Sequence, residues 1–395
     1  MYFDAFQCDE KELAKFLFSF ISFKGQNDPE VDRRAISYSL EQLSSQLNVE
    51  SPMLSFPAMV LWKITGECNS KCSHCWANLG HAPKRNELIT VAEELRDNGA
   101  LMVSLSGGEP FLCDDIFDII KILKERNIII DILSNGSLLD ETVVRKLSRI
   151  LNRETDTIQI SLDGSTGSIH DSQRGMPIFD YAVSGIRLLK EYEFKVRNVF
   201  VATPINQFNL FETYKLSCRL GVDVFAPCPV FPLRKGKNFK NTIDSVNYLR
   251  QVAACKSIEH ESATKLRIQV DQYYQYLLNK YFNEIGYAFL NQLNGDRIRI
   301  PETNTSMQID ASGNALPGPE WEIDMSAGNV YQQSVKEVWR NGINWGSFRK
   351  GRCLKNSRCS NCRIFDICCG GNAKLAYDTY ETIDMPDGTC MIGGV

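Results

Sequence analysis

The chain has 395 residues, of which 43% are hydrophobic, 23% charged and 10% aromatic, and this composition excludes a disordered chain or a small single-core scaffold. Its 44 basic and 48 acidic residues leave a formal net charge of -4, which excludes the global positive field that collects nucleic acid. The first residues are acidic, and no apolar run approaches the roughly 18 residues of a membrane span, so we expect neither export nor membrane insertion. Without export, the 14 cysteines favour metal or cluster ligation over disulfides.

Residues 1–57 have amphipathic helical patterns that end at two proline breaks, which predicts an N-terminal helical extension. Residues 58–235 contain six short apolar runs that alternate with amphipathic segments, a pattern typical of parallel strands joined by helices. Six such units are too few for a closed eight-stranded barrel, so the predicted fold class is α/β with a partial (β/α)6 TIM-like barrel. The strands are expected at 58–65, 101–106, 128–134, 157–163, 196–203 and 222–228, with helices near 86–98, 114–126, 139–151, 179–193 and 209–220.

Two further units are expected after the barrel. Residues 236–300 contain helical patterns near 243–258 and 271–293, which predict a layer of bridging helices. Residues 301–395 begin with a pattern typical of a hairpin that turns at Ser312-Gly313-Asn314, continue with a short helical pattern at 335–341, and end in a cysteine-rich irregular tail. We therefore predict a small C-terminal domain organised by its cysteines.

One group of cysteines follows the first expected strand directly. Cys68, Cys72 and Cys75 have the spacing C-x3-C-x2-C, so three thiolates would gather at the carboxyl edge of the sheet, where parallel folds place their chemistry. Three protein ligands leave one metal position open, unlike the four of a structural zinc site. His74 could still complete a zinc set, so zinc stays an alternative.

This spacing closely resembles that of the radical S-adenosylmethionine (SAM) enzymes, and other motifs of that family follow at successive strand ends. They are the GGE segment at 107–109, Ser134-Asn135-Gly136, Ser161-Leu162-Asp163-Gly164 and the HD-x-x-RG segment at 170–175. The resemblance implies a [4Fe-4S] cluster held by Cys68, Cys72 and Cys75, whose open iron chelates SAM and whose electron yields a 5′-deoxyadenosyl radical.

The same resemblance implies which residues bind SAM. The GGE segment would contact the methionyl amino group through Glu109, and Arg174 would pair with the methionyl carboxylate. His74 would pack near adenine, while the polar residues at the later strand ends would lie toward the ribose or adenine. The full implied set is His74, Gly107, Gly108, Glu109, Ser134, Asn135, Ser161, Asp163, Arg174 and Thr203, with Asn206 close to Thr203.

A second group of cysteines resembles the SPASM extension that follows the barrel in many radical SAM enzymes. The resemblance implies an auxiliary iron–sulfur cluster, expected to be [4Fe-4S], held by Cys359, Cys362, Cys368 and Cys390. Cys353 is an alternative fourth ligand and Cys369 could also compete, while a zinc knuckle remains an alternative for the whole set.

Two cysteines of the SPASM pattern are missing. The chain has Gly318 and Asn372 at those positions, and no cysteine lies between Cys255 and Cys353. We therefore predict that the first auxiliary cluster site is absent. Its place could have become a substrate pocket in which the turn at 317–322 offers Glu320 as a catalytic carboxylate, although an ordinary surface loop is the alternative.

Two single cysteines are candidate hydrogen-atom donors. Cys113 follows the GGE segment closely, and Cys228 ends the sixth expected strand. Either thiol could return a hydrogen atom to a substrate radical, as in some epimerases of the family. The alternative for both is a small buried apolar residue.

The resemblance implies a radical SAM enzyme acting on a peptide or protein substrate by crosslinking, oxidation or epimerisation. A dehydrogenase, epimerase or dehydratase of a sugar or aminoglycoside-type molecule is the alternative, and a noncatalytic zinc-binding interaction protein is the alternative from another class. The clusters imply a reducing, cytoplasmic setting and an electron donor of the flavodoxin or ferredoxin type. Neither nucleic acid nor membrane is an expected partner.

Overall fold

The computed structural model describes residues 54–75, 77, 80, 82–239, 243–261, 265–269, 302–350, 352–354, 357–362, 370–387 and 390. The predicted N-terminal helices and the predicted helix at 271–293 lie outside the described residues. None of the described helices is both long and apolar enough to cross a membrane.

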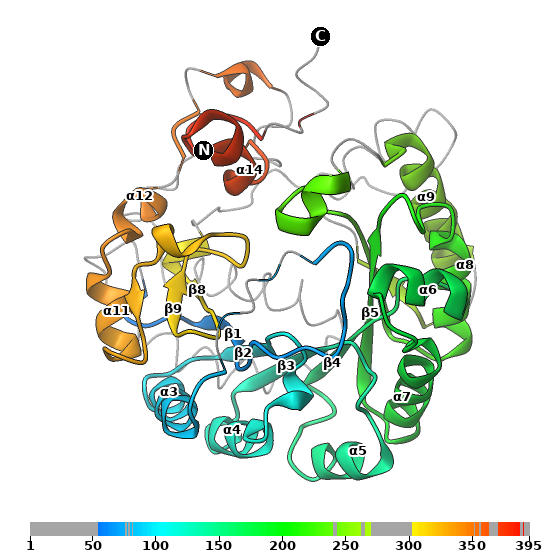
Figure 1. Cartoon of the computed structure of the whole chain (residues 1–395), viewed down its shortest axis with the longest axis horizontal. Helices are drawn as coiled ribbons and strands as arrows, with labels where there is room; N and C mark the ends of the chain where they lie inside the picture. The colour runs from blue at the N-terminus through cyan, green and yellow to red at the C-terminus, as the bar shows by residue number, and fades with distance from the viewer. Residues whose placement is uncertain are drawn as a thin grey trace.

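The ten described strands form one sheet, in the order β10-β9-β8-β1-β2-β3-β4-β5-β6-β7. The six consecutive strands β1 to β6 are parallel and correspond to the six predicted ones, so the prediction of an α/β partial barrel is confirmed. Figure 1 shows these strands curving through the centre of the molecule with helices outside them. The strands are β1 (Met59–Lys63), β2 (Met102–Ser106), β3 (Ile129–Ser134), β4 (Thr157–Ser161), β5 (Lys195–Ala202) and β6 (Val224–Pro229).

The five predicted barrel helices are present and cover the outer face of the sheet (Figure 1). Their apolar residues recur at helical spacing, as in α4, where Ile116, Ile119, Ile120 and Leu123 are buried. The barrel helices are α3 (Arg85–Asp97), α4 (Ile116–Lys124), α5 (Glu141–Leu147), α7 (Phe179–Glu191) and α8 (Leu210–Arg219), with a short η1 (Pro110–Leu112). A further helix, α6 (Gly167–Arg174), was not predicted because its sequence GSIHDSQR has too few apolar residues to show a helical period.

Alternation along the strands separates an outer from an inner face. Val60 and Trp62 of β1 and Val103 and Leu105 of β2 belong to the apolar core shared with the helices. The residues between them, such as Leu61, therefore lie on the inner face of the partial barrel.

The sheet extends past the barrel at both ends. Beyond β6 lie η2 (Arg234–Phe239), α9 (Ser245–Glu261) and β7 (Arg267–Ile268), and α9 lies where the first helical pattern after the barrel was predicted. At the other end β8 (Ser306–Ile309) pairs in parallel with β1 and antiparallel with β9 (Asn314–Leu316), which pairs with β10 (Gly328–Asn329). The predicted hairpin is therefore β8–β9, and its turn residue Gly313 has a φ of 84°, which favours glycine. Its pairing with β1 had no signal in the sequence.

The C-terminal segment packs against the barrel through α11 (Val335–Asn341), the predicted short helix. The backbone N–H of Val335 donates to Glu94 of α3 at 2.7 Å, and the indole of Trp339 donates to the carbonyl of Leu54 at 2.8 Å. The other elements of this segment are η4 (Glu302–Asn304), η5 (Ile323–Met325), α12 (Trp345–Arg349), η6 (Arg358–Asn361) and α14 (Ala373–Tyr380).

Candidate active site

The first cysteine group lies in the loop that follows β1, at the carboxyl edge of the sheet. Cys68, Cys72 and Cys75 are all partly exposed and form no disulfide. Two other segments hold the backbone of this loop: the GGE segment after β2 on one side, and the C-terminal end of α6 on the other. Within the described residues, no three His, Cys, Asp or Glu side chains converge as the ligands of a single metal ion do.

The glycines of the GGE segment let it approach the cysteine loop. The backbone N–H of Gly108 donates to the carbonyl of Thr65 at 3.0 Å, and that of Glu109 donates to the carbonyl of Glu67 at 2.8 Å. A Cβ atom at Gly107 would lie 2.4 Å from the Thr65 carbonyl oxygen, and one at Gly108 only 2.0 Å from that of Glu67. Any side chain at these two positions would therefore push the loops apart.

Glu109 is fully buried and joins the GGE segment to the end of β3. Its carboxylate accepts from the hydroxyl of Ser134 and from the backbone N–H of Asn135, both at 2.7 Å, and from the backbone N–H of Phe111 at 3.3 Å. The side-chain amide of Asn135 in turn donates to Asn69 of the cysteine loop at 2.7 Å. Burial raises the pKa of Glu109 to about 7 against the opposing effect of these hydrogen bonds. A carboxylate has about four acceptor sites, so room remains for one further donor.

The carboxyl end of α6 holds the other side of the cysteine loop. The backbone N–H groups of Lys71 and Ser73 donate to the carbonyls of Arg174 and Gln173, at 3.0 and 2.9 Å. These carbonyls belong to the last turn of the helix, where no partner exists within the helix itself. Gly175 ends α6 with a φ of 69°, and a Cβ atom there would lie 2.7 Å from the carbonyl oxygen of Lys71.

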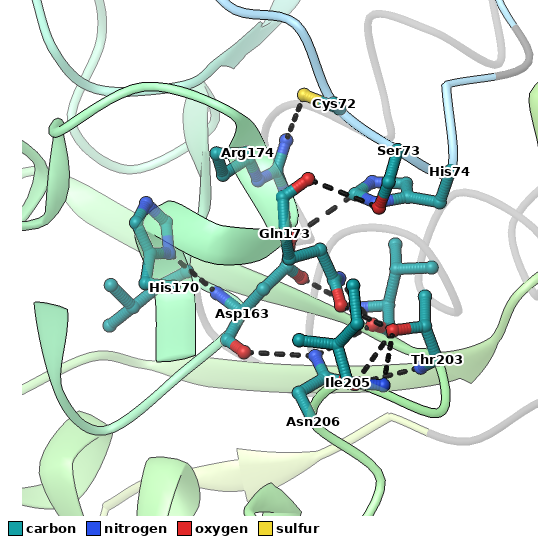
Figure 2. Close-up of polar contacts among 12 residues, drawn as sticks. Cys72, Ser73, His74, Asp163, His170, Gln173, Arg174, Thr203, Ile205 and Asn206 are labelled. Atoms are coloured by element: carbon teal, nitrogen blue, oxygen red, sulfur yellow. Dashed lines mark hydrogen bonds and ion pairs between the residues drawn. The ribbon is translucent and has the colours of Figure 1, made fainter. Parts of the chain in front are cut away.

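Arg174 lies between a cysteine and a buried carboxylate, as Figure 2 shows. Its guanidinium donates to the sulfur of Cys72 at 3.7 Å and forms an ion pair with Asp163 at 2.6 Å. Burial of Asp163 acts to raise its pKa, but Arg174, the two histidines His74 and His170 and the backbone N–H of Val201 together outweigh burial, and the pKa is lowered. Asp163 is therefore ionised, and one buried positive charge lies beside the Cys72 thiol.

Two histidines flank Asp163 (Figure 2). The Nε2 atom of His74 lies 4.0 Å from the Asp163 carboxylate, and the Nδ1 atom of His170 accepts from the Asp163 backbone N–H at 3.0 Å. Burial lowers the pKa of each ring to about 4, so both are neutral near pH 7. Nδ1 of His74 and Nε2 of His170 are buried and have no hydrogen-bond partner in the described part of the chain.

Thr203 belongs to the same polar network. Its hydroxyl donates to the side chain of Gln173 at 2.6 Å and its backbone N–H to Asn206 at 2.7 Å, while the Asn206 amide donates to the Asp163 carbonyl at 2.9 Å. Ser161 ends β4 and is partly exposed. The structure thus brings most residues of the predicted set together, and it adds His170 and Gln173, which lie within the HD-x-x-RG motif and could have been selected from it.

Lys63 lies near Cys75 and was not predicted from the sequence as a candidate residue. It ends β1 on the inner face and is only 5% exposed. Burial lowers its pKa to about 8, Arg234 acts in the same direction, and Asp310, Cys75 and Glu320 act to raise it. The available signal was a lysine inside the apolar run AMVLWKIT, because lysine is rarely buried without a partner.

The two single cysteines differ in their surroundings. Cys113 is buried in the apolar core beside α4, and burial raises the pKa of its thiol to about 11. Cys228 is partly exposed at the carboxyl end of β6. Because Phe225 of β6 lies in the outer core, alternation puts Cys228 on the inner face, where the Cys113 side chain does not lie.

The two positions at which SPASM cysteines are missing lie beside the same carboxylate. The side-chain amide of Asn372 donates to Glu320 at 3.4 Å, and a Cβ atom at Gly318 would lie 2.7 Å from a Glu320 carboxylate oxygen. Trp321, the next residue, is buried and packs edge-on against Phe348 at 4.8 Å between ring centroids. The indole therefore contributes to packing of the C-terminal segment, whereas Glu320 faces both altered positions.

The second cysteine group is partly described. Cys359 is buried, burial raises the pKa of its thiol, and Cys390 and Cys362 raise that pKa further, so these three thiols are electrostatic neighbours. Cys353 is exposed. Cys368 lies outside the described residues.

Comparison with known families agrees with this geometry. Residues 62–216 match the model of the Radical SAM superfamily, and residues 301–363 match that of an iron–sulfur cluster-binding domain, SPASM.

The chain is also similar to individual proteins over most of its length. The chain is 24% identical over 347 residues to the AdoMet-dependent heme synthase of Methanosarcina barkeri, covering 84% of this chain and 96% of the relative. It is 25% identical over 357 residues to the mycofactocin maturase MftC of Mycolicibacterium smegmatis, covering 86% and 84%. Its fold is similar to that of Streptococcus suis SuiB bound to its precursor peptide SuiA, with a TM-score of 0.68, 20% identity and coverage of 92% and 81%.

Proposed function

Since this chain belongs to the radical SAM superfamily and carries a C-terminal SPASM iron–sulfur domain, we propose that it modifies a peptide or protein side chain by hydrogen-atom abstraction. When bound, the [4Fe-4S] cluster and SAM supply a 5′-deoxyadenosyl radical. We propose that Cys68, Cys72 and Cys75 hold this cluster. Three thiols in a single loop with its backbone tied on both sides support the assignment.

The other residues of the site would bind and orient SAM. Arg174 offers a guanidinium at the cysteine loop, and Glu109 retains one acceptor position for an ammonium group. The buried, unpartnered ring nitrogens of His74 and His170 offer neutral hydrogen-bonding positions in the described part of the site. Asp163 would keep Arg174 in place, because the pair is buried and 2.6 Å apart.

We assign the auxiliary cluster to Cys359, Cys362, Cys368 and Cys390. The effect of Cys390 on the pKa of the Cys359 thiol supports Cys390 over Cys353 as the fourth ligand. The first auxiliary cluster would be absent, since the chain has Gly318 and Asn372 in place of two SPASM cysteines and Glu320 lies beside both. Glu320 then stays a candidate for substrate contact, together with the inner-face thiol of Cys228.

Anaerobic reconstitution tests the radical chemistry. With dithionite and SAM, the wild-type protein should form 5′-deoxyadenosine, and Cys68→Ser should form none. Iron analysis gives a second readout: the triple variant with serine at Cys68, Cys72 and Cys75 should retain one cluster of the two. A protein that binds zinc and yields no 5′-deoxyadenosine would refute the proposal.

The proposal of a peptide substrate is based on the similar proteins. MftC is named a maturase, and SuiB was solved with a precursor peptide. The test is to add each short peptide encoded next to the gene and measure 5′-deoxyadenosine formation and the mass of the peptide. A mass change that requires SAM would support the proposal, and no change with any such peptide would count against it.

A tetrapyrrole carboxylate is the second candidate. The Methanosarcina barkeri relative is named a heme synthase, and Arg234, which pairs with Glu322 at 2.5 Å, is an electrostatic neighbour of the buried Lys63. Stimulation of 5′-deoxyadenosine formation by an iron tetrapyrrole rather than by a peptide would favour it. In either case we propose an electron donor of the flavodoxin or ferredoxin type in a reducing, cytoplasmic setting.

A further inference from the structure

A row of inner-face residues crosses four neighbouring strands of the barrel. The register pairs Gln308 of β8 with Leu61 of β1, Leu61 with Ser104 of β2, and Ser104 with Asp131 of β3. Partners in register point to the same face of a sheet, so these four side chains lie side by side on the inner face. Parallel barrels normally fill this face with branched apolar residues.

Two members of this row carry buried polar atoms that lack a partner. Gln308 is 1% exposed, and neither its side-chain oxygen nor its nitrogen has a hydrogen-bond partner among the described residues. Asp131 is 4% exposed, and its Oδ1 atom likewise has none there, whereas its Oδ2 atom pairs with Arg197 at 3.4 Å. Such atoms make the folded chain less stable unless another group satisfies them, and a side-chain amide with both atoms unsatisfied is unusual.

We propose that the Gln308 amide binds the backbone of one residue of the extended peptide substrate, donating to that residue's C=O and accepting from its N–H. This inference rests on the proposed function, since it specifies how the peptide is held. A glutamine amide offers N–H donors and a C=O acceptor, and a residue of an extended chain presents its own N–H and C=O on the same side, so the two are complementary. A tetrapyrrole carboxylate has only acceptors and would leave the Gln308 oxygen unsatisfied.

The position of Asp131 gives the expected length of the bound segment. Three strand spacings separate Gln308 from Asp131, which is about 14 Å along the sheet. An extended peptide covers about 3.4 Å per residue, so roughly four residues reach from one side chain to the other. A peptide lying across the row would bring a second N–H to the Asp131 carboxylate. Lys63 lies two residues beyond Leu61 on the same face, toward the carboxyl edge.

The test uses reconstituted holoenzyme with SAM under anaerobic conditions and two blocked probes. N-acetyl-tetraglycine amide has the expected length and its backbone N–H groups, and N-acetyl-tetrasarcosine amide lacks those N–H groups within its four residues. In saturation-transfer NMR, wild type should bind the glycine probe and give at least a fivefold weaker signal with the sarcosine probe. Gln308→Met, which keeps the length of the side chain, should reduce the glycine signal at least fivefold. The matched control Gln332→Met alters an exposed glutamine and should bind like wild type.

The melting temperature of Gln308→Met should change in the opposite direction to its probe binding. If the Gln308 amide lacks a partner within the protein, Gln308→Met should raise the melting temperature of the probe-free holoenzyme by about 2 °C or more. A fall would show an internal partner and overturn the inference, as would equal glycine-probe signals for wild type and Gln308→Met. Gln308→Glu, which keeps the size but loses the N–H donor, serves as the second variant if the methionine protein does not fold, and it should also weaken the glycine-probe signal.

The radical chemistry is measured on the same preparations. Wild type that forms 5′-deoxyadenosine but gives no glycine-probe signal would refute this inference alone. Wild type that binds the probe and forms no 5′-deoxyadenosine would refute the proposed function instead.

Discussion

The ion pair between Asp163 and Arg174 yields a quantitative prediction. The Asp163 side chain is fully buried and that of Arg174 is 8% exposed, at 2.6 Å from each other. Asp163→Asn keeps the oxygen that accepts from the backbone N–H of Val201 at 2.8 Å, and removes the charge. The variant leaves a buried guanidinium uncompensated, which costs about 3–5 kcal/mol when one partner of a buried pair is lost. We therefore expect the free energy of unfolding to fall by about 3 kcal/mol or more.

The assay is urea unfolding of the cluster-free, reduced protein, so that cluster loss does not contribute. The double variant Asp163→Asn/Arg174→Met removes the uncompensated charge and should recover about 2 kcal/mol relative to Asp163→Asn. Glu212→Gln is the control, because it breaks the exposed pair of Glu212 with Lys215 and should change stability by less than about 1 kcal/mol. An Asp163→Asn protein as stable as this control would refute the reasoning.

Three further predictions concern the loops and the clusters. Glu109 has a pKa raised from 4.5 to about 7, so wild type should lose stability as the pH rises from about 4.5 to about 7 and no more above it, and urea titrations should show that Glu109→Gln lacks this loss, worth roughly 3 kcal/mol. Gly108→Ala should prevent binding of the cluster at Cys68, Cys72 and Cys75, measured as the loss of one cluster's iron. Gly346→Ala, with nothing within 4 Å of its added methyl group, should bind iron like wild type. Cys390→Ser should reduce the iron content by one cluster and Cys353→Ser should not, and the reverse result would exchange their assignments.

Most of the barrel could be predicted because its determinants are local. Six apolar runs and five amphipathic segments each have a period that a sequence displays, and all eleven elements are present. The helix α6 was missed because tertiary contacts stabilise it: its last carbonyls accept from Lys71 and Ser73 of a loop about 100 residues earlier in the chain. The pairing of β8 with β1 was missed because no local pattern encodes which distant strand becomes a neighbour.

The candidate site also contains residues that local motifs could predict and residues that depend on tertiary contacts. Motif spacing was sufficient to select Glu109, Asp163 and Arg174, but it suggested that they face a ligand, while the structure shows each also bonded to protein atoms. Lys63 was missed because a single lysine in a strand indicates burial only when the inner face is known. Its surroundings include Asp310, which follows β8, so they depend on the pairing that the sequence did not reveal.

The pairing of β8 with β1 brings residues of the C-terminal segment next to the strand that leads into the cysteine loop. Because β8 extends the sheet beside β1, the strand that leads into the cysteine loop has a C-terminal neighbour in parallel register. Gln308 and Asp310 thereby join the inner face next to Leu61 and Lys63, and the chain from Asp310 continues through the hairpin to Glu320. A substrate held on this face would contact residues from both ends of the chain at once. Gly318 and Asn372, the two positions without SPASM cysteines, therefore lie beside a carboxylate, Glu320, that also acts on the pKa of Lys63.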